Sequence, residues 1–100
     1  MKADKIARIL DRVRYCVQHA RYYDTRHATD RQTQRAITRP EILHVLTNGR
    51  HEQSKDTYQE RYRSWNYAIR GRTIDRRDIR VIVSFDDNNM LIIKAIEVGK

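Results

Sequence analysis

The stretch Ile79-Arg80-Val81-Ile82-Val83-Ser84-Phe85 is followed by the cluster Asp86-Asp87-Asn88-Asn89 and then by an apolar run from Met90 to Val98. The first seven residues place β-branched and aromatic side chains at alternate positions, which is typical of a strand. Four consecutive Asp and Asn residues favour a turn. Residues 79–98 therefore predict a β-hairpin.

The sheet extends upstream of this hairpin. Trp65-Asn66-Tyr67-Ala68-Ile69-Arg70 alternates bulky and polar groups and predicts another strand, which we expect Gly71 to break. Residues 50–64 are polar and poor in aliphatic side chains, and they predict an edge strand followed by a long exposed loop.

Helical patterns dominate the first half of the chain. One amphipathic helix, with Asp4 as its N-cap, is predicted from apolar residues at helical spacing: Ile6, Ile9, Leu10, Val13 and Val17. The aromatic-rich residues 21–25 predict a short strand, and residues 28–35 have helix-forming composition.

A second helix start is marked by Thr38-Arg39-Pro40-Glu41, which matches a capping box with Pro in the first turn. Its apolar side chains are Ile42, Leu43, Val45 and Leu46, and Asn48-Gly49 predicts a left-handed stop. Helices first and strands later indicate an α+β fold, with helices against one face of an antiparallel sheet. A length of 100 residues predicts one domain over residues 1–100.

The composition is strongly basic. Lys and Arg number 21 against 13 Asp and Glu, a formal charge of +8, and only 5 of the cations are Lys. Such an arginine excess favours a polyanionic partner, either nucleic acid or an acidic protein. The lone Cys16 predicts a reducing compartment, and no apolar stretch predicts a targeting or membrane-spanning segment, so we expect a cytoplasmic protein without membrane contact.

Arginine and aromatic residues alternate most densely between Arg61 and Arg80. Single-stranded nucleic acid favours this composition, because guanidinium groups pair with phosphates and bases stack on rings. A solvated charged face or a surface for an acidic protein partner are the alternatives. The nucleic-acid-binding residues predicted from this stretch are Arg61, Arg63, Trp65, Arg70, Arg72, Arg76, Arg77 and Arg80.

The layout resembles a known family. The residues that carry the likeness are Thr25-Arg26-His27-Ala28, Arg31, Arg35, Ile37, Val45 to Gly49, Tyr67 and the strands at 79–85 and 91–98. They resemble a small bacterial family of unassigned function with a His-Ala…Arg…Arg signature, which is similar to the RelE/MqsR-like mRNA-cleaving toxins. The resemblance implies two or three N-terminal helices on a curved antiparallel sheet of three to five strands. It also implies RNA cleavage, ribosome-associated mRNA as a possible substrate, and an antitoxin protein as a possible partner. The nearest occupants of the toxins' site positions add Lys55 and Asn66 to the predicted nucleic-acid-binding residues.

Metal-independent RNA cleavage needs proton-transfer groups and cations that hold the phosphate. His27 is the candidate acid or base, Arg31 and Arg35 are candidate phosphate clamps, and Tyr67 or Lys94 can supply the second proton. His27 bonded to backbone, and the two arginines as a solvated face, are the alternatives.

No cofactor or metal is predicted, since His19, His44 and His51 are spaced too irregularly for ligands and are expected at the surface or partly packed. The leading hypothesis is a toxin-type endoribonuclease. The alternatives are a non-catalytic RNA- or DNA-binding module and a module that binds an acidic protein. All of these depend on guanidinium groups from distant stretches gathering in one positively charged hollow.

Overall fold

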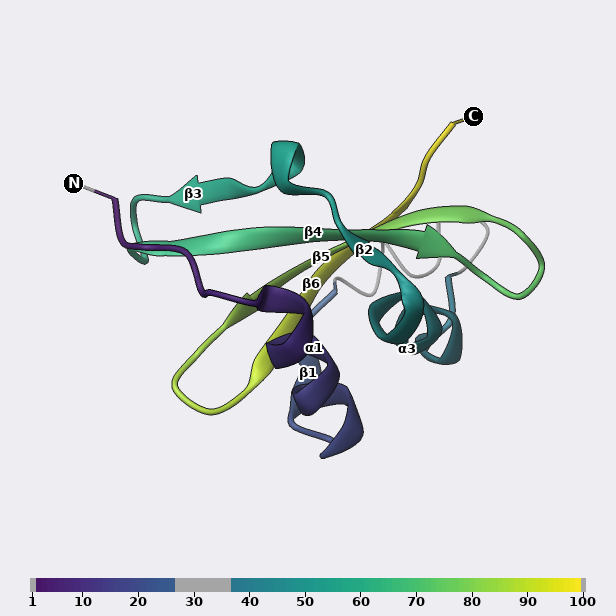
Figure 1. Cartoon of the computed structure of the whole chain (residues 1–100), viewed down its shortest axis with the longest axis horizontal. Helices are drawn as coiled ribbons and strands as arrows, with labels where there is room; N and C mark the ends of the chain where they lie inside the picture. Colours follow the sequence, from purple (N-terminus) through teal and green to yellow (C-terminus); the bar gives the residue numbers. More distant parts are fainter. Residues whose placement is uncertain (1, 27–36, 100) are drawn as a thin grey trace.

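Two helices lie against one side of a six-stranded sheet in the computed structural model, which describes residues 2–26 and 37–99 (Figure 1). The elements in chain order are α1 (Ile9–Gln18), β1 (Tyr22–Asp24), α3 (Arg39–Asn48), β2 (Arg50–His51), the 3₁₀ turn η1 (Gln53–Lys55), β3 (Thr57–Gln59), β4 (Ser64–Arg72), β5 (Asp78–Phe85) and β6 (Met90–Glu97). The α+β class is confirmed. The helix predicted over residues 28–35 lies outside the described residues.

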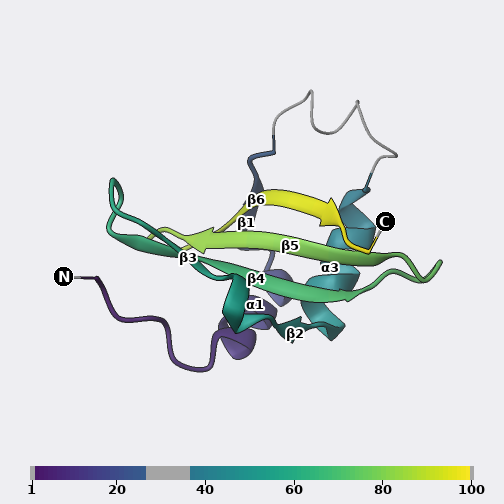
Figure 2. The same ribbon diagram turned by 90° about the horizontal axis from the view of Figure 1, so that it is seen from above.

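The strands run in the order β1-β6-β5-β4-β2, and β3 also pairs with β4 (Figure 2). The central strands β4, β5 and β6 are antiparallel, whereas β1 runs parallel to β6 with Tyr22 opposite Met90. The expectation of three to five antiparallel strands is therefore wrong in number and in direction. Strand partners 68 positions apart leave no periodic signal in the sequence, so the pattern at 21–25 predicts a strand but not its orientation.

The predicted hairpin is confirmed as β5 and β6, with a register shift after Ile82. The expected break at Gly71 is wrong, because β4 continues through Gly71 to Arg72. A Cβ atom at Gly71 would lie 3.1 Å from the Cα of Gly49, so this glycine allows two backbone segments to approach each other.

Gly49 ends α3, but it does so in extended backbone with φ −79° and not in the predicted left-handed conformation. A Cβ atom there would lie 2.5 Å from the Val45 oxygen and 2.6 Å from the Arg70 oxygen. The residue is therefore required for the close contact between the end of α3 and β4.

Both helices bury an apolar side against the sheet. The capping box is confirmed: Thr38 accepts from the Glu41 backbone N–H, and the Glu41 carboxylate accepts from the Thr38 N–H at 2.8 Å. Helix α1 begins only at Ile9, so neither Ile6 nor an Asp4 cap belongs to it; Arg8 precedes it with φ 54°. The shared core contains Val13, Cys16, Ile42, Val45, Leu46, Tyr67, Ile69, Ile79, Val81, Val83, Met90 and Ile92.

Residues 2–8, which we call the N-terminal strap, cross the start of β4 (Figure 1). Trp65 donates its indole N–H to the Ala3 oxygen at 2.8 Å, and the Ala3 N–H donates to the Tyr58 hydroxyl at 3.1 Å. The Ile6 N–H donates to the Tyr67 hydroxyl at 2.8 Å. Side chains of the sheet therefore hold this irregular segment in place.

The sheet has two unlike faces. Side chains alternate along each strand, so the register assigns every residue to a face. One face carries Tyr67, Ile69, Val81 and Val83 and packs on α1 and α3. We call the other side the open face, because no described helix covers it. Its residues are Ser64, Asn66, Ala68, Arg70 and Arg72 of β4, Asp78, Arg80, Ile82 and Ser84 of β5, and Leu91, Lys94 and Ile96 of β6.

Candidate nucleic-acid interface

Three arginines lie side by side across the open face. Arg50 of β2 is opposite Arg70 of β4, which is in turn opposite Arg80 of β5. Like charges on directly opposed residues repel, so such a row needs anions close by. Arg72 lies two residues beyond Arg70 on the same face. We call Arg50, Arg70, Arg72 and Arg80 the arginine cluster.

Two carboxylates lie within this cluster. Glu52 accepts from Arg80 Nε at 2.6 Å and from Arg70 Nη1 at 2.9 Å, and thus bridges β4 and β5. Asp78 accepts from the same Arg70 through Nε at 3.1 Å and Nη2 at 2.7 Å, in a bidentate pair. Arg70 is therefore held in one position by two anions.

These contacts change the protonation equilibria. Hydrogen bonding by Arg80 lowers the pKa of Glu52 to about 2, against a desolvation effect that raises it and with Arg70 lowering it further. Hydrogen bonding by Arg70 likewise lowers the pKa of Asp78, and its bonds to Asp78 and Glu52 raise the pKa of Arg70. Both carboxylates are consequently ionised at neutral pH.

The cluster keeps an excess of positive charge. Four guanidinium groups surround two carboxylates, which leaves a net charge of two positive units. Arg50 and Arg72 are exposed and form no ion pair within 2–26 and 37–99. They line a cavity of about 610 Å³ with Arg70, Asp78, Asn48 and the backbone of Gly49 and Gly71. Exposed arginines beside a preorganised one form a site suited to phosphate.

Two further predicted residues share the open face. Lys94 is exposed and lies opposite Ile82, on the diagonal from Arg80, so these two cations project from the same face. Asn66 lies nearer the start of β4 and is half-buried. The open face thus brings together Asn66, Arg70, Arg72, Arg80 and Lys94.

Three predicted residues lie elsewhere. Tyr67 is 2% exposed on the covered face, whereas Lys94 projects from the open face, so the two alternative sources of the second proton lie on opposite sides of the sheet. Trp65 is on the same side as Tyr67, with Lys2 and Lys5 over its ring. Arg77 is buried between Glu41 at 3.4 Å and Glu97 at 3.3 Å, where it joins α3 to β6.

The remaining predicted cations lie on connections. Lys55 ends η1, Arg61 and Arg63 lie in the turn before β4, and Arg76 lies in the turn before β5; all four are exposed. The catalytic candidates His27, Arg31 and Arg35 lie outside the described residues. The expected gathering of arginines is present in part of the described chain, since Arg50, Arg70 and Arg72 line one cavity, whereas Arg77 is buried away from it between Glu41 and Glu97.

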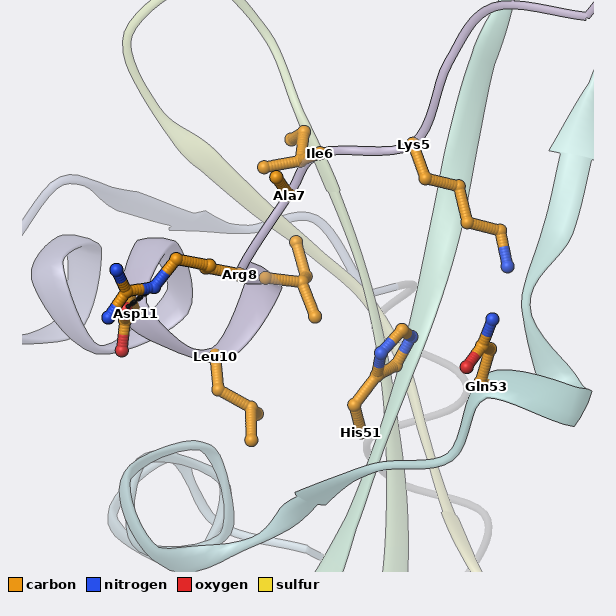
Figure 3. Close-up of a pocket in the computed structure, with 9 residues that line it drawn as sticks. Lys5, Ile6, Ala7, Arg8, Leu10, Asp11, His51 and Gln53 are labelled. Atoms are coloured by element: carbon orange, nitrogen blue, oxygen red, sulfur yellow. Dashed lines mark ion pairs between the residues drawn. The ribbon is translucent and has the colours of Figure 1, made fainter.

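A second polar site lies at the edge of the sheet. The Asp56 side chain is fully buried, and its Oδ2 contacts His51 Nε2 at 2.7 Å and Lys5 Nζ at 2.9 Å. Its Oδ1 accepts from the Ala68 N–H at 2.9 Å, in the gap between β2 and β3. Figure 3 shows His51 facing the strap across a pocket of about 560 Å³, with Gln53 and Lys5 on one side and Arg8 and Leu10 on the other.

Sequence reasoning missed the residues that complete both sites. Arg50 and Glu52 are two residues apart, on either side of His51, so strand alternation predicts that Arg50 and Glu52 share a face. His51 is partly packed as predicted, but its pairing with Asp56 depends on a turn of irregular backbone that no periodicity describes.

Other chemistries have less structural support. Within residues 2–26 and 37–99, no three His, Cys, Asp or Glu side chains are grouped as a metal site. Neither of the helices described is long and apolar enough to cross a bilayer.

Comparison with known proteins adds a family assignment. Residues 25–97 match the model of a domain of unknown function, DUF4258. No curated protein matches the chain, and no solved structure does. The match contains the whole arginine cluster, His51 and Asp56, whereas the strap and α1 lie outside it. The unassigned small family is confirmed, and the likeness to RelE/MqsR-like toxins stays a prediction.

Proposed function

The chain belongs to the DUF4258 family of domains of unknown function, and on that premise we propose that it binds single-stranded RNA across the open face of its sheet. The arginine cluster would hold the phosphates. The observation that carries this proposal is the row Arg50-Arg70-Arg80, in which Glu52 and Asp78 fix Arg70 while Arg50 and Arg72 stay exposed.

The geometry supports a binding role for this row better than a purely structural one. Glu52 and Asp78 make their ion pairs with Arg70 and Arg80, whereas Arg50 and Arg72 form no ion pair among the described residues and add positive charge to the site. A bound phosphate would give these two exposed arginines a paired counter-charge. A flat sheet face with phosphate-binding arginines suits an extended single strand, whose bases are free to contact the protein.

We expect the Arg50→Ala/Arg72→Ala double variant to bind single-stranded RNA about tenfold more weakly at low salt, and its salt slope to fall by about two. Both side chains are exposed, so the fold should be retained. Binding is measured by fluorescence anisotropy with a labelled oligoribonucleotide over a series of salt concentrations.

The matched control is Arg12→Ala/Arg21→Ala, which removes two exposed arginines outside the cluster. It loses the same charge and should change affinity less than threefold. Equal losses in both variants would show that net charge alone, and not the cluster, binds the RNA.

Cleavage of the bound RNA is a second proposal, favoured by the His51–Asp56 pair. Asp56 engages His51 Nε2, and Nδ1 has no hydrogen-bond partner among the described residues. His51 follows Arg50 in β2 but is paired with Ile69 on the covered face, beside the Tyr67 ring, so an RNA strand on the open face would have to turn around the β2 edge to reach it. His51 would take the proton of a ribose 2′-hydroxyl; the 2′-oxygen then bonds to phosphorus, the bond to the 5′-oxygen breaks, and that oxygen takes up a proton.

We expect the protein to convert RNA in the presence of a chelator into fragments ending in a 2′,3′-cyclic phosphate. His51→Gln should reduce the rate at least a hundredfold, because general acid–base groups contribute about 10²–10⁴-fold. His44→Gln, a half-exposed histidine of α3, is the control and should retain the rate. Fragments produced equally by both variants would contradict this role of His51, and absence of fragments with intact binding would leave the protein a binding module.

A further inference from the structure

An apolar pocket opens on the open face of the sheet, at the opposite end of this face from the arginine cluster. Its volume is about 630 Å³, which is within the range of small-molecule sites. The apolar part of its wall comes from Phe85, Leu91 and Ile93 around the β5–β6 turn. Polar side chains of Gln59 and Asn66 border it from β3 and β4.

We infer that this pocket binds a nucleobase of the RNA strand whose phosphates contact the arginine cluster. The inference rests on the proposed RNA binding and adds a base-binding site to it. On the alternating register, Asn66 and Arg70 lie on the same face of β4, about 13 Å apart along the strand. A short oligonucleotide spans that length, so one strand can reach both places.

The charge of the residues that line the pocket favours the neutral base of a nucleotide over its phosphate. Asp86 is the one formally charged residue among those that line the pocket, and its Oδ1 already accepts from the Asn88 and Asn89 backbone N–H groups at 3.0 and 2.7 Å. A carboxylate repels phosphate, and no cation of the described chain lines this pocket to compensate. The phosphate therefore belongs with the arginines and the base with the pocket.

The polar groups suit the edge of a base. Gln59 and Asn66 carry amides that each offer a donor pair and an acceptor, and neither amide has a hydrogen-bond partner among residues 2–26 and 37–99. Asn and Gln amides bind adjacent donor and acceptor groups of a base in this way. The two amides therefore provide the hydrogen bonds that an apolar pocket alone lacks.

Exposed rings complete the site. Tyr62 borders the pocket and is 69% exposed, and Tyr23 of β1, opposite Leu91, is 58% exposed on the same face. The Arg61 guanidinium lies 5.5 Å from the centre of the Tyr62 ring, and bases stack on exposed rings of this kind. Stacking by Tyr62 would cover a base that enters the pocket.

The test compares a normal oligoribonucleotide with one of the same length in which every base is absent. The two have the same phosphates, so we expect the abasic strand to bind about tenfold more weakly, as stacking is worth about 1–3 kcal/mol per base. Tyr62→Ala and Asn66→Leu should each weaken binding of the normal strand severalfold and leave the abasic strand unchanged. Tyr15→Ala removes an exposed tyrosine of α1 and serves as the control.

The outcomes separate this inference from the proposed function. If neither strand binds, the RNA-binding proposal fails and the inference fails with it. If both strands bind equally and only Arg50→Ala/Arg72→Ala weakens them, RNA binding stands and the base pocket is rejected. If Tyr62→Ala lowers the affinity for the normal strand more than that for the abasic strand, the base pocket is supported. Titration of adenosine and uridine monophosphates into methyl-labelled protein should then shift the NMR signals of Leu91 and Ile93.

Discussion

Asp56→Ala should lower the free energy of unfolding by about 2–4 kcal/mol, because one buried carboxylate holds three separate donors. The substitution leaves the Ala68 N–H without its acceptor and removes the anion between Lys5 and His51. The lower part of the range applies if the exposed parts of Lys5 and His51 turn to solvent. Urea unfolding followed by Trp65 fluorescence measures the change, and Trp65 is the only tryptophan of the chain.

Two variants define the origin of that loss. Asp11→Ala breaks an exposed pair with Arg8 and should change stability by less than about 0.5 kcal/mol. Asp56→Asn keeps an acceptor for Ala68 but removes the charge, so its effect should lie between the two. Equal stability of the Asp56 and Asp11 alanine variants would mean that the buried carboxylate does not hold the strap.

Glu52→Gln should have opposite effects on stability and on RNA binding. It weakens the bridge between Arg70 and Arg80 and should destabilise the fold by about 1–3 kcal/mol, since Arg80 then loses the carboxylate with which it pairs, while Arg70 keeps Asp78. It also frees Arg80 for phosphate, so RNA affinity should rise about threefold or more at low salt. Glu60→Gln changes the charge equally in an exposed turn and should alter neither property much.

Glu52→Gln should also change how the stability of the fold depends on pH. The folded pKa of Glu52, about 2, lies below its ordinary value, so Glu52 stabilises the fold fully above that ordinary value. This contribution is lost as the pH falls from about 4.5 toward 2. Glu52→Gln should therefore flatten the decline of stability in this range, while the lowered pKa of Asp78 leaves part of it. An unchanged acid profile in Glu52→Gln would contradict the bridge.

Local patterns in the sequence predict the individual elements well. The hairpin, the capping box and the short strand at 21–25 each depend on neighbouring residues, and all three are confirmed. The start of α1 was predicted too early because Ile6 has helical spacing from Ile9 and Leu10, yet its N–H is bonded to Tyr67 of β4. A hydrogen bond between distant residues decided that boundary.

The arginine cluster is less predictable from the sequence, because it too depends on contacts between distant residues. The arginine-rich composition of residues 61–80 predicts Arg70, Arg72 and Arg80 as nucleic-acid-binding residues, and strand alternation places all three on one face. Composition does not distinguish them from Arg77, which is buried between Glu41 and Glu97. The partners that decide each arginine's role come from other strands, so only the three-dimensional pairing separates a phosphate site from a structural ion pair.

The three-residue strand β1 also protects the sheet from self-association. Its parallel pairing covers the outer edge of β6 from Met90 to Ile92, where apolar residues would otherwise offer an unpaired backbone to another molecule. The other edge is interrupted, since β2 and β3 are short and are separated by η1. A chain shortened to the limits of the family match begins at Thr25 and lacks β1. Its strand β6 would then have an unpaired edge, and the chain would be prone to aggregate.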